Sequence, residues 1–315
     1  MSRLIGVGPP KVRRKGPGMQ IHEGLLRTIG FTVPEGQSTP NGTCFLATIG
    51  CDLPGHRHGY VITAEHCVIA SSTTAIWMLD ATGQRHLDGE VSAWVTDHDN
   101  DIAVAEWHDQ ADKRLWAGSN LNEVEDRPIT VRYGDSVIYA GLLIPVLGLA
   151  EQGAPAVREG TVSAFNAPNI EYGERRIASA HLMDVRSRRG FSGSPCWVGR
   201  LFIPVDQLRE SADPFVGPWS FTFLWGMLLG WGDKDGLGVV VPIERTIEVI
   251  RKNPDLASAR DKADKAERKR RRDDGGLEEA SEPSQRFTEG DFLSDLSKAT
   301  RPYPPPKKKR PSQGG

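Results

Sequence analysis

A serine beside two glycines is the first group in this chain that could do covalent chemistry. The run RGFSGSP at residues 189–195 places Ser192 where the backbone can approach a substrate carbonyl closely. A serine hydroxyl is a weak nucleophile until a base removes its proton and N–H donors stabilise the oxyanion. The run therefore requires a histidine and a carboxylate elsewhere in the chain.

Both groups occur upstream of the serine. The run TAEHC at residues 63–67 contains His66, and the run DNDIAV at residues 99–104 contains Asp101. The gaps are 35 residues from His66 to Asp101 and 91 residues from Asp101 to Ser192. We prefer Asp101 to the aspartates at 97 and 99 because it directly precedes an apolar run, which predicts a strand that buries it against His66.

The three runs, in this order, resemble the motifs of the trypsin-like (chymotrypsin-fold) serine peptidases, in particular single-domain bacterial members. The resemblance covers roughly residues 20–252. It implies that Ser192 attacks the scissile carbonyl, that His66 is the general base and that Asp101 orients the imidazole. It also implies an oxyanion hole made of the backbone N–H groups of Gly190 and Ser192.

One departure from the family pattern concerns activation. Phe191 stands directly before the nucleophile, where zymogen-type members have an aspartate that captures a newly made N-terminal amine. A phenylalanine cannot form that ion pair, and no Ile-Val-Gly-Gly-like run occurs near residue 20. We therefore expect no activation by N-terminal cleavage.

The resemblance also points to a specificity pocket. Counting six residues back from the nucleophile gives Arg186 at its base, which would favour an acidic substrate side chain through a bidentate contact. The alternative is that this arginine is simply exposed, together with its basic neighbours. Gly230 and Trp231 are expected in the pocket wall, with Gly238 on the opposite side, and Trp231 could narrow the pocket.

Histidines and cysteines elsewhere in the chain offer alternative chemistry. His56 and His58 compete with His66 for the role of base, but they lie in a turn rich in proline and glycine, so we expect them to be exposed and idle. With Cys51 and Cys67 they could be read as a metal site, yet the spacing matches no common zinc pattern, so we expect no metal and no cofactor.

The resemblance leaves the state of the cysteines open. In the family, the cysteine after the catalytic histidine often pairs with an upstream one. Cys44 lies 23 residues before Cys67, so this disulfide is conceivable. In a reducing compartment we expect free thiols instead.

About a dozen short apolar runs, cut by Gly, Asn, Asp and Pro, follow Gly24 and predict an all-β fold. The family's architecture is two six-stranded antiparallel β-barrels with the site between them. A closing helix is predicted after Pro242, because Ile243, Ile247 and Ile250 share one helical face, and Pro254 ends it. The alternating charges that follow predict an exposed, charged helix and then a disordered basic tail.

The expected organisation has three parts: a flexible basic arm over residues 1–20, a peptidase domain over 21–254 and a charged helix with a disordered tail over 255–315. The arm carries five basic residues and no acidic ones, and residues 251–315 carry 17 basic and 12 acidic ones. Solvated tails explain this charge best, so we do not expect nucleic-acid binding. Residues 200–222 are read as an insertion that forms a lid or a partner surface. Residues 287–296 form an apolar island that either docks on a partner or fluctuates.

No signal-peptide pattern and no apolar run long enough to span a bilayer is visible, which predicts a cytoplasmic protein without membrane contact. The leading hypothesis is a serine endopeptidase acting on a protein or peptide substrate. The alternative is a binding or scaffold protein of protease shape with a closed site. An intact set of three motifs argues against the alternative.

Overall fold

The computed structural model describes residues 23–79, 85–107, 119–126, 131–143, 155–185, 190–202, 219–231 and 237–273. The predicted basic arm, most of the predicted insertion and the apolar island at 287–296 lie outside the described residues. The chain divides into two compact units by the contacts between its own residues: Met1–Asp264 and Lys265–Gly315.

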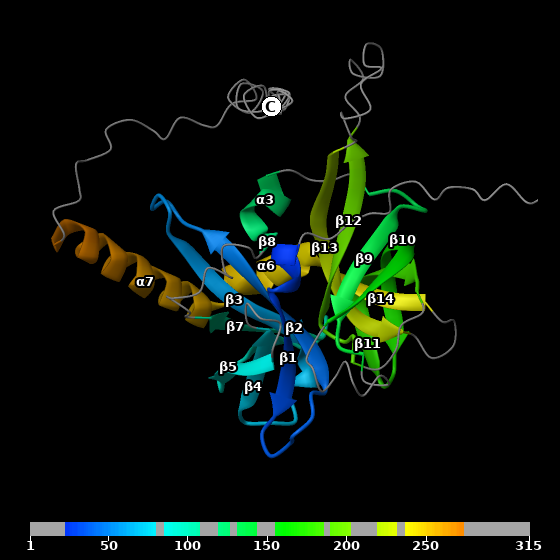
Figure 1. The fold of residues 1–315 in the computed structure, drawn as a ribbon, viewed down its shortest axis with the longest axis horizontal. Helices are drawn as coiled ribbons and strands as arrows, with labels where there is room; N and C mark the ends of the chain where they lie inside the picture. The colour runs from blue at the N-terminus through cyan, green and yellow to red at the C-terminus, as the bar shows by residue number, and fades with distance from the viewer. Residues whose placement is uncertain are drawn as a thin grey trace, which may run out of the picture. The chain divides into compact units, whose positions relative to one another are not determined.

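The first half of the chain forms one eight-stranded sheet (Figure 1). Its main strand order is β5-β4-β1-β2-β3-β7-β6, with antiparallel neighbours, and β8 joins β2 in parallel. The short helices α1 (Glu23–Leu26), η1 (Glu65–Cys67) and α3 (Leu121–Asp126) accompany it. The strands are β1 (Ile29–Pro34), β2 (Gly42–Gly50), β3 (Arg57–Ala64), β4 (Thr74–Leu79), β5 (Arg85–Val91), β6 (Val95–Asp97), β7 (Ile102–Trp107) and β8 (Ser119–Asn120).

The second half forms a closed six-stranded barrel in the order β10-β11-β14-β13-β12-β9, drawn in green and yellow in Figure 1. The all-β class with two antiparallel sheet units is confirmed, and this barrel has the expected six strands. The first sheet has two more strands than expected, the short β6 and β8, and its order is open over the described residues. The barrel strands are β9 (Ser136–Gly141), β10 (Ala156–Tyr172), β11 (Arg175–Asp184), β12 (Ser194–Phe202), β13 (Trp219–Trp231) and β14 (Leu237–Pro242).

Strand β2 is buried on both faces. Alternating side chains of a strand point to opposite faces, and here Phe45 and Ala47 enter one apolar core while Cys44 and Leu46 enter another. The larger core also contains barrel residues, among them Trp197 and Met227. Strand β2 is therefore held between the interior of the first sheet and the barrel.

Two helices follow the barrel. Helix α6 (Ile243–Lys252) buries Ile243, Ile247 and Ile250, which confirms the predicted helix and its apolar face. It ends before Pro254, where helix α7 (Pro254–Asp273) begins. Most described side chains of α7 are exposed or partly exposed, as the charge pattern predicts, and Leu256 is its buried anchor. Among the described residues, none of the helices has the length and apolar character needed to cross a membrane.

Candidate functional site

His66 and Asp101 meet because their strands are neighbours. His66 lies in η1, directly after β3, and Asp101 lies directly before β7. Strands β3 and β7 pair antiparallel, with Ala64 opposite Ile102. The end of one strand and the start of the other are thereby adjacent. His66 Nδ1 lies 2.6 Å from Asp101 Oδ2, and the His66 backbone N–H donates to Asp101 Oδ1 at 2.9 Å.

Asp101 is fully buried and is held from several directions. Its φ of 54° lies in the left-handed region, which aspartate tolerates better than most residues. Arg175 Nη1 donates to Asp101 Oδ1 at 2.7 Å and also to Glu65 Oε2 at 2.7 Å. Glu65 is itself buried, and His98 Nδ1 lies 3.0 Å from its Oε2. The site thus contains two buried carboxylates bridged by one arginine.

Sequence reasoning missed Arg175 and the role of Glu65. Glu65 stands inside the histidine motif, directly after a predicted buried strand, and a carboxylate that is buried needs a partner. Arg175 begins β11 and lies 74 residues from Asp101 along the chain, with no motif around it. Only the folded β10–β11 hairpin brings it to the site.

The surroundings of His66 favour its charged form. Burial alone would lower the pKa of His66, but its contacts with Asp101 and Cys67 outweigh that effect and raise the pKa to about 10. A protonated imidazole carries a hydrogen on both nitrogens and cannot accept a third. The raised pKa favours the imidazolium form, which must lose a proton before His66 can act as a base.

The backbone of the serine loop is set by glycines and by β2. Gly193 has a φ of 84°, and a side chain there would bring its Cβ within 1.9 Å of the Thr43 carbonyl oxygen, so only glycine fits. The Thr43 N–H donates to the Ser192 carbonyl at 2.8 Å. The Thr43 hydroxyl donates to the Gly190 carbonyl at 2.7 Å and accepts from the Leu142 N–H at 2.8 Å. One threonine of the first sheet thus holds both ends of the barrel's serine loop.

The Ser192 hydroxyl points to a carbonyl group. It donates to the Leu229 carbonyl oxygen at 2.7 Å, and the described contacts contain no hydrogen bond between it and His66. The Tyr172 hydroxyl donates to the same carbonyl at 2.6 Å, and the Tyr172 ring centroid lies 6.1 Å from that of His66. Serine and imidazole therefore share a neighbour, Tyr172, which sequence reasoning also missed.

The amides expected to bind an oxyanion belong to Gly190 and Ser192. Among the described residues, the N–H groups of Gly190 and Ser192 have no hydrogen-bond acceptor. Gly190 has a φ of 100°, a conformation that glycine adopts readily. Phe191, between them, is fully buried and packs edge-on against Tyr139 at a centroid distance of 5.2 Å. An apolar anchor holds the loop here without an ion pair.

The structure describes some of the residues expected around a specificity pocket. Arg186 lies outside the described residues. A side chain at position 238 would place its Cβ 2.7 Å from the Val185 side chain. A side chain at position 230 would place its Cβ 2.4 Å from the Tyr172 hydroxyl. The space beside both glycines is therefore filled. For Trp231 the structure describes the backbone, which pairs with Gly238.

Other candidate residues fall outside the site. Asp97 closes a polar turn, accepting from the N–H groups of Asp99 and Asn100. All four cysteines are free, so the conceivable Cys44–Cys67 disulfide is not formed, and Cys67 Sγ lies 3.8 Å from the Ser192 carbonyl oxygen. The described ligand cluster that could hold a metal consists of Cys51, His56, His58 and Asp264, and it contains neither His66 nor Cys67.

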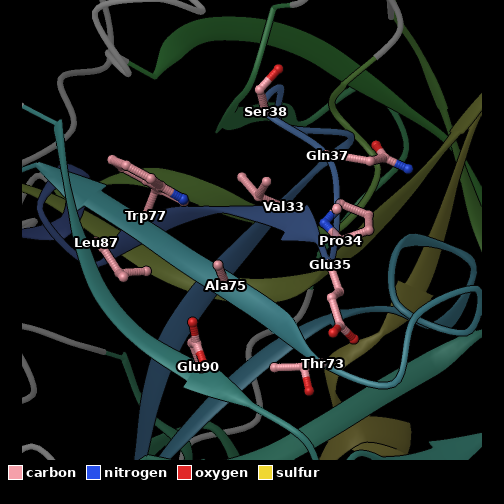
Figure 2. Close-up of a pocket in the computed structure, with 11 residues that line it drawn as sticks. Val33, Pro34, Glu35, Gln37, Ser38, Thr73, Ala75, Trp77, Leu87 and Glu90 are labelled. Atoms are coloured by element: carbon pink, nitrogen blue, oxygen red, sulfur yellow. The ribbon is translucent and has the colours of Figure 1, made fainter.

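A separate pocket lies over β1, β4 and β5 (Figure 2). Trp77 and Leu87 provide apolar surface, and Glu35 and Glu90 provide two carboxylates. None of the three proposed catalytic residues lines it.

Comparison with known proteins gives likeness of fold only. No protein-family model and no curated protein matches the chain. The chain is similar to the crystal structure of the MamO protease domain from Magnetospirillum magneticum, at 18% identity over 72% of this chain and 98% of that one, with a TM-score of 0.47. It is also similar to the serine endoprotease from Yersinia pestis, at 16% identity over 72% and 64% of the two chains, with a TM-score of 0.43. At these identities no activity is assigned.

Proposed function

We propose that this chain is a serine endopeptidase that hydrolyses protein or peptide substrates with His66, Asp101 and Ser192. The observation that carries the proposal is the 2.6 Å contact between His66 Nδ1 and a fully buried Asp101 oxygen. A buried carboxylate that fixes one imidazole nitrogen leaves the other free to exchange protons. The nearby Ser192 loop, with two amides that have no acceptor among the described residues, supports the assignment.

The reaction begins with a rotation of the Ser192 side chain. Its hydroxyl leaves the Leu229 carbonyl and turns toward Nε2 of a neutral His66, a change between staggered rotamers. Oγ attacks the scissile carbonyl carbon while its proton passes to His66 Nε2. The carbonyl oxygen becomes an oxyanion and accepts hydrogen bonds from the N–H groups of Gly190 and Ser192. His66 then gives its proton to the leaving amine, and a water molecule repeats the sequence on the acyl-enzyme.

Asp101 acts on His66 throughout this cycle. Its Oδ2 accepts a hydrogen bond from Nδ1–H, which fixes the tautomer and stabilises the imidazolium formed during attack. Arg175 shares the Asp101 carboxylate, so it limits how strongly that charge favours the imidazolium. In the proposal, Arg175 is a positioning residue.

The proposed enzyme needs no N-terminal cleavage. Phe191 cannot form the ion pair that orders the serine loop in zymogen-type enzymes, but its burial against Tyr139 supplies an apolar anchor in its place. The Thr43 contacts supply the hydrogen bonds. Both devices are parts of the fold itself.

We infer the substrate preference from the sequence position of Arg186, six residues before Ser192. An arginine at the pocket base favours an acidic side chain before the cut site. Cleavage of a peptide library should therefore show Asp or Glu at that position, and Arg186→Ala should remove the preference while Arg188→Ala leaves it. A basic or apolar preference in the unaltered protein refutes the assignment.

The second candidate function is a binding or scaffold protein with a closed site. The observation in its favour is that Ser192 and Tyr172 both donate to the Leu229 carbonyl, which keeps the hydroxyl away from His66. A side chain that stays there cannot attack a substrate. The two functions differ in whether the hydroxyl can leave this carbonyl.

A fluorophosphonate probe, which reacts with activated serines, distinguishes them. We expect labelling of the unaltered protein, loss of labelling in Ser192→Ala and retention in Ser194→Ala. Ser194 is a matched control, because its buried hydroxyl makes no hydrogen bond among the described residues. A folded protein that is not labelled above the Ser192→Ala level, even at alkaline pH, is the scaffold.

A further inference from the structure

Four metal-binding side chains meet near the turn between β2 and β3. Cys51 and His56 lie in this turn, His58 lies at the start of β3, and Asp264 comes from α7. One ligand atom from each residue lies within 4.8 Å of every other. His58 Nε2 lies 3.0 Å and His56 Nε2 lies 3.6 Å from Asp264 Oδ1. All four residues are partly buried, so the cluster is enclosed and still reachable from solvent.

The donor set is the one that zinc prefers. Zinc in proteins is bound by cysteine sulfur at about 2.3 Å and by histidine nitrogen and carboxylate oxygen at about 2.0–2.2 Å, in tetrahedral geometry. Tetrahedral bonds of these lengths place neighbouring ligand atoms roughly 3.3–3.8 Å apart. The distances from Asp264 to His56 and His58 lie at or near this range. A cation can therefore be held with small side-chain adjustments.

Hydrogen bonding alone does not account for the cluster. His56 Nε2 is buried and makes no hydrogen bond among the described residues. Cys51 Sγ accepts the Leu53 N–H at 3.4 Å, a contact that suits a metal-bound thiolate because the sulfur is then an acceptor. A cation between these atoms would give His56 Nε2 a partner, and it would give Cys51 Sγ, which also contacts the His56 carbonyl oxygen at 3.8 Å, a stronger one. Such a buried polar atom without a partner calls for an explanation of this kind.

The fold places Asp264 at the cluster by contacts that do not involve the four ligands. Arg260, one turn earlier on α7, donates to the Tyr60 hydroxyl at 3.1 Å and to the Ile250 carbonyl at 2.7 Å. Leu256 is buried at the start of the same helix. Arg260 is also the neighbouring positive charge that opposes a bound cation, and these two hydrogen bonds hold its guanidinium. The site is therefore built from a strand, a tight turn and a packed helix.

We propose that Cys51, His56, His58 and Asp264 bind one divalent cation of the zinc class in a closed, four-coordinate structural site. Binding releases the Cys51 proton to solvent and uses both histidines in their neutral form. The cation would join α7 to the β2–β3 turn. The sequence-based expectation of no metal weighed Cys67 as the fourth ligand, whereas the structure brings Asp264, which lies 206 residues beyond His58.

The test is metal binding by the purified full-length chain, freed of metal with a chelator. Cobalt(II) serves as a spectroscopic probe, because four-coordinate cobalt with a thiolate gives intense visible bands and a sulfur-to-metal charge-transfer band. Zinc titration by competition with a chromophoric chelator gives stoichiometry and affinity. We expect one equivalent of zinc, the four-coordinate cobalt spectrum and a higher midpoint of thermal unfolding with zinc.

The variants assign the ligands. Asp264→Asn and Cys51→Ser should each weaken zinc binding by roughly a hundredfold, and Cys51→Ser should also remove the charge-transfer band. Asp261→Asn, an exposed aspartate on the same helix, is the matched control and should bind like the unaltered chain. The proposal is overturned by a six-coordinate cobalt spectrum, by less than one equivalent of zinc, or by equal binding in Asp264→Asn and Asp261→Asn. Far-ultraviolet circular dichroism before titration establishes that each variant is folded.

Discussion

Replacing Thr43 with valine tests how the serine loop is held. The Thr43 hydroxyl donates to the Gly190 carbonyl and accepts the Leu142 N–H, and both hydrogen bonds are buried. Valine has nearly the same shape and removes both. A hydrogen bond contributes about 1 kcal/mol net, and leaving a buried partner unsatisfied costs about 1–3 kcal/mol. With two partners affected, Thr43→Val should lower the free energy of unfolding by about 2–6 kcal/mol.

Thr48→Val is the matched control. Thr48 lies in the same strand and is 1% exposed, but its hydroxyl makes no hydrogen bond among the described residues. Removing an unpaired buried hydroxyl leaves stability unchanged or raises it, because burial of such a group is costly. The two variants share the chemical change and differ only in the hydrogen bonds lost.

Urea unfolding at equilibrium and the rate of fluorophosphonate labelling are the two measurements. Because the Gly190 carbonyl belongs to the loop that carries the proposed oxyanion amides, Thr43→Val should also slow labelling by roughly tenfold or more. Thr48→Val should neither lower the free energy of unfolding nor slow labelling. If the two variants unfold within about 0.5 kcal/mol of each other, the Thr43 bridge does not hold the loop and the reasoning fails.

Four further predictions concern the groups around the imidazole. Labelling should accelerate as pH rises from about 7 to 10, because the pKa of His66 is raised to about 10 and only its neutral form is a base; a flat profile contradicts this. The stability of the fold should depend on pH in the opposite direction. The pKa of His66 is higher in the folded state than its unfolded value near 6.5, so the stabilisation by the His66 imidazolium is complete below about pH 6.5 and is lost as pH rises through about 10. Urea unfolding across this pH range measures the loss. Arg175→Gln removes a cation from the Asp101 carboxylate, so it should raise the pKa of His66 further, as an NMR titration would show. Tyr172→Phe should speed labelling by freeing the Leu229 carbonyl of one donor, whereas Tyr133→Phe, on an exposed side chain, should not; equal rates would exclude a blocking role.

The parts of the fold that follow from local pattern could be predicted from the sequence. Residues 102–105 are apolar and follow Asp101 directly, and residues 61–64, apolar except for Thr63, end two residues before His66. Two buried strands that pair antiparallel then bring the two side chains together. Helix α6 was predictable for a similar reason, since three isoleucines at helical spacing follow a proline.

The contacts that could not be predicted are single polar pairs far apart in the chain. Thr43 bonds to Gly190 across 147 residues, and Arg175 reaches Glu65 across 110. An isolated threonine or arginine has no periodicity, so its sequence surroundings do not identify its partner. The rotamer of Ser192 is a further case: the motif specifies the residue, but the neighbouring Leu229 carbonyl decides where the hydroxyl points.

Strand β3 connects the two proposed sites. It begins next to the metal-ligand cluster at His58 and ends just before His66, roughly 20 Å further along at 3.3 Å per residue. Between them, Tyr60 receives a hydrogen bond from Arg260 of α7. The strand pairs with β2 from Arg57 to Thr63 and with β7 over six positions, so its backbone has little freedom to shift. We therefore expect a cation bound at the turn to stabilise the docking of α7 and to leave the geometry of His66 unchanged, as a structural element of the fold and not a switch for the proposed reaction.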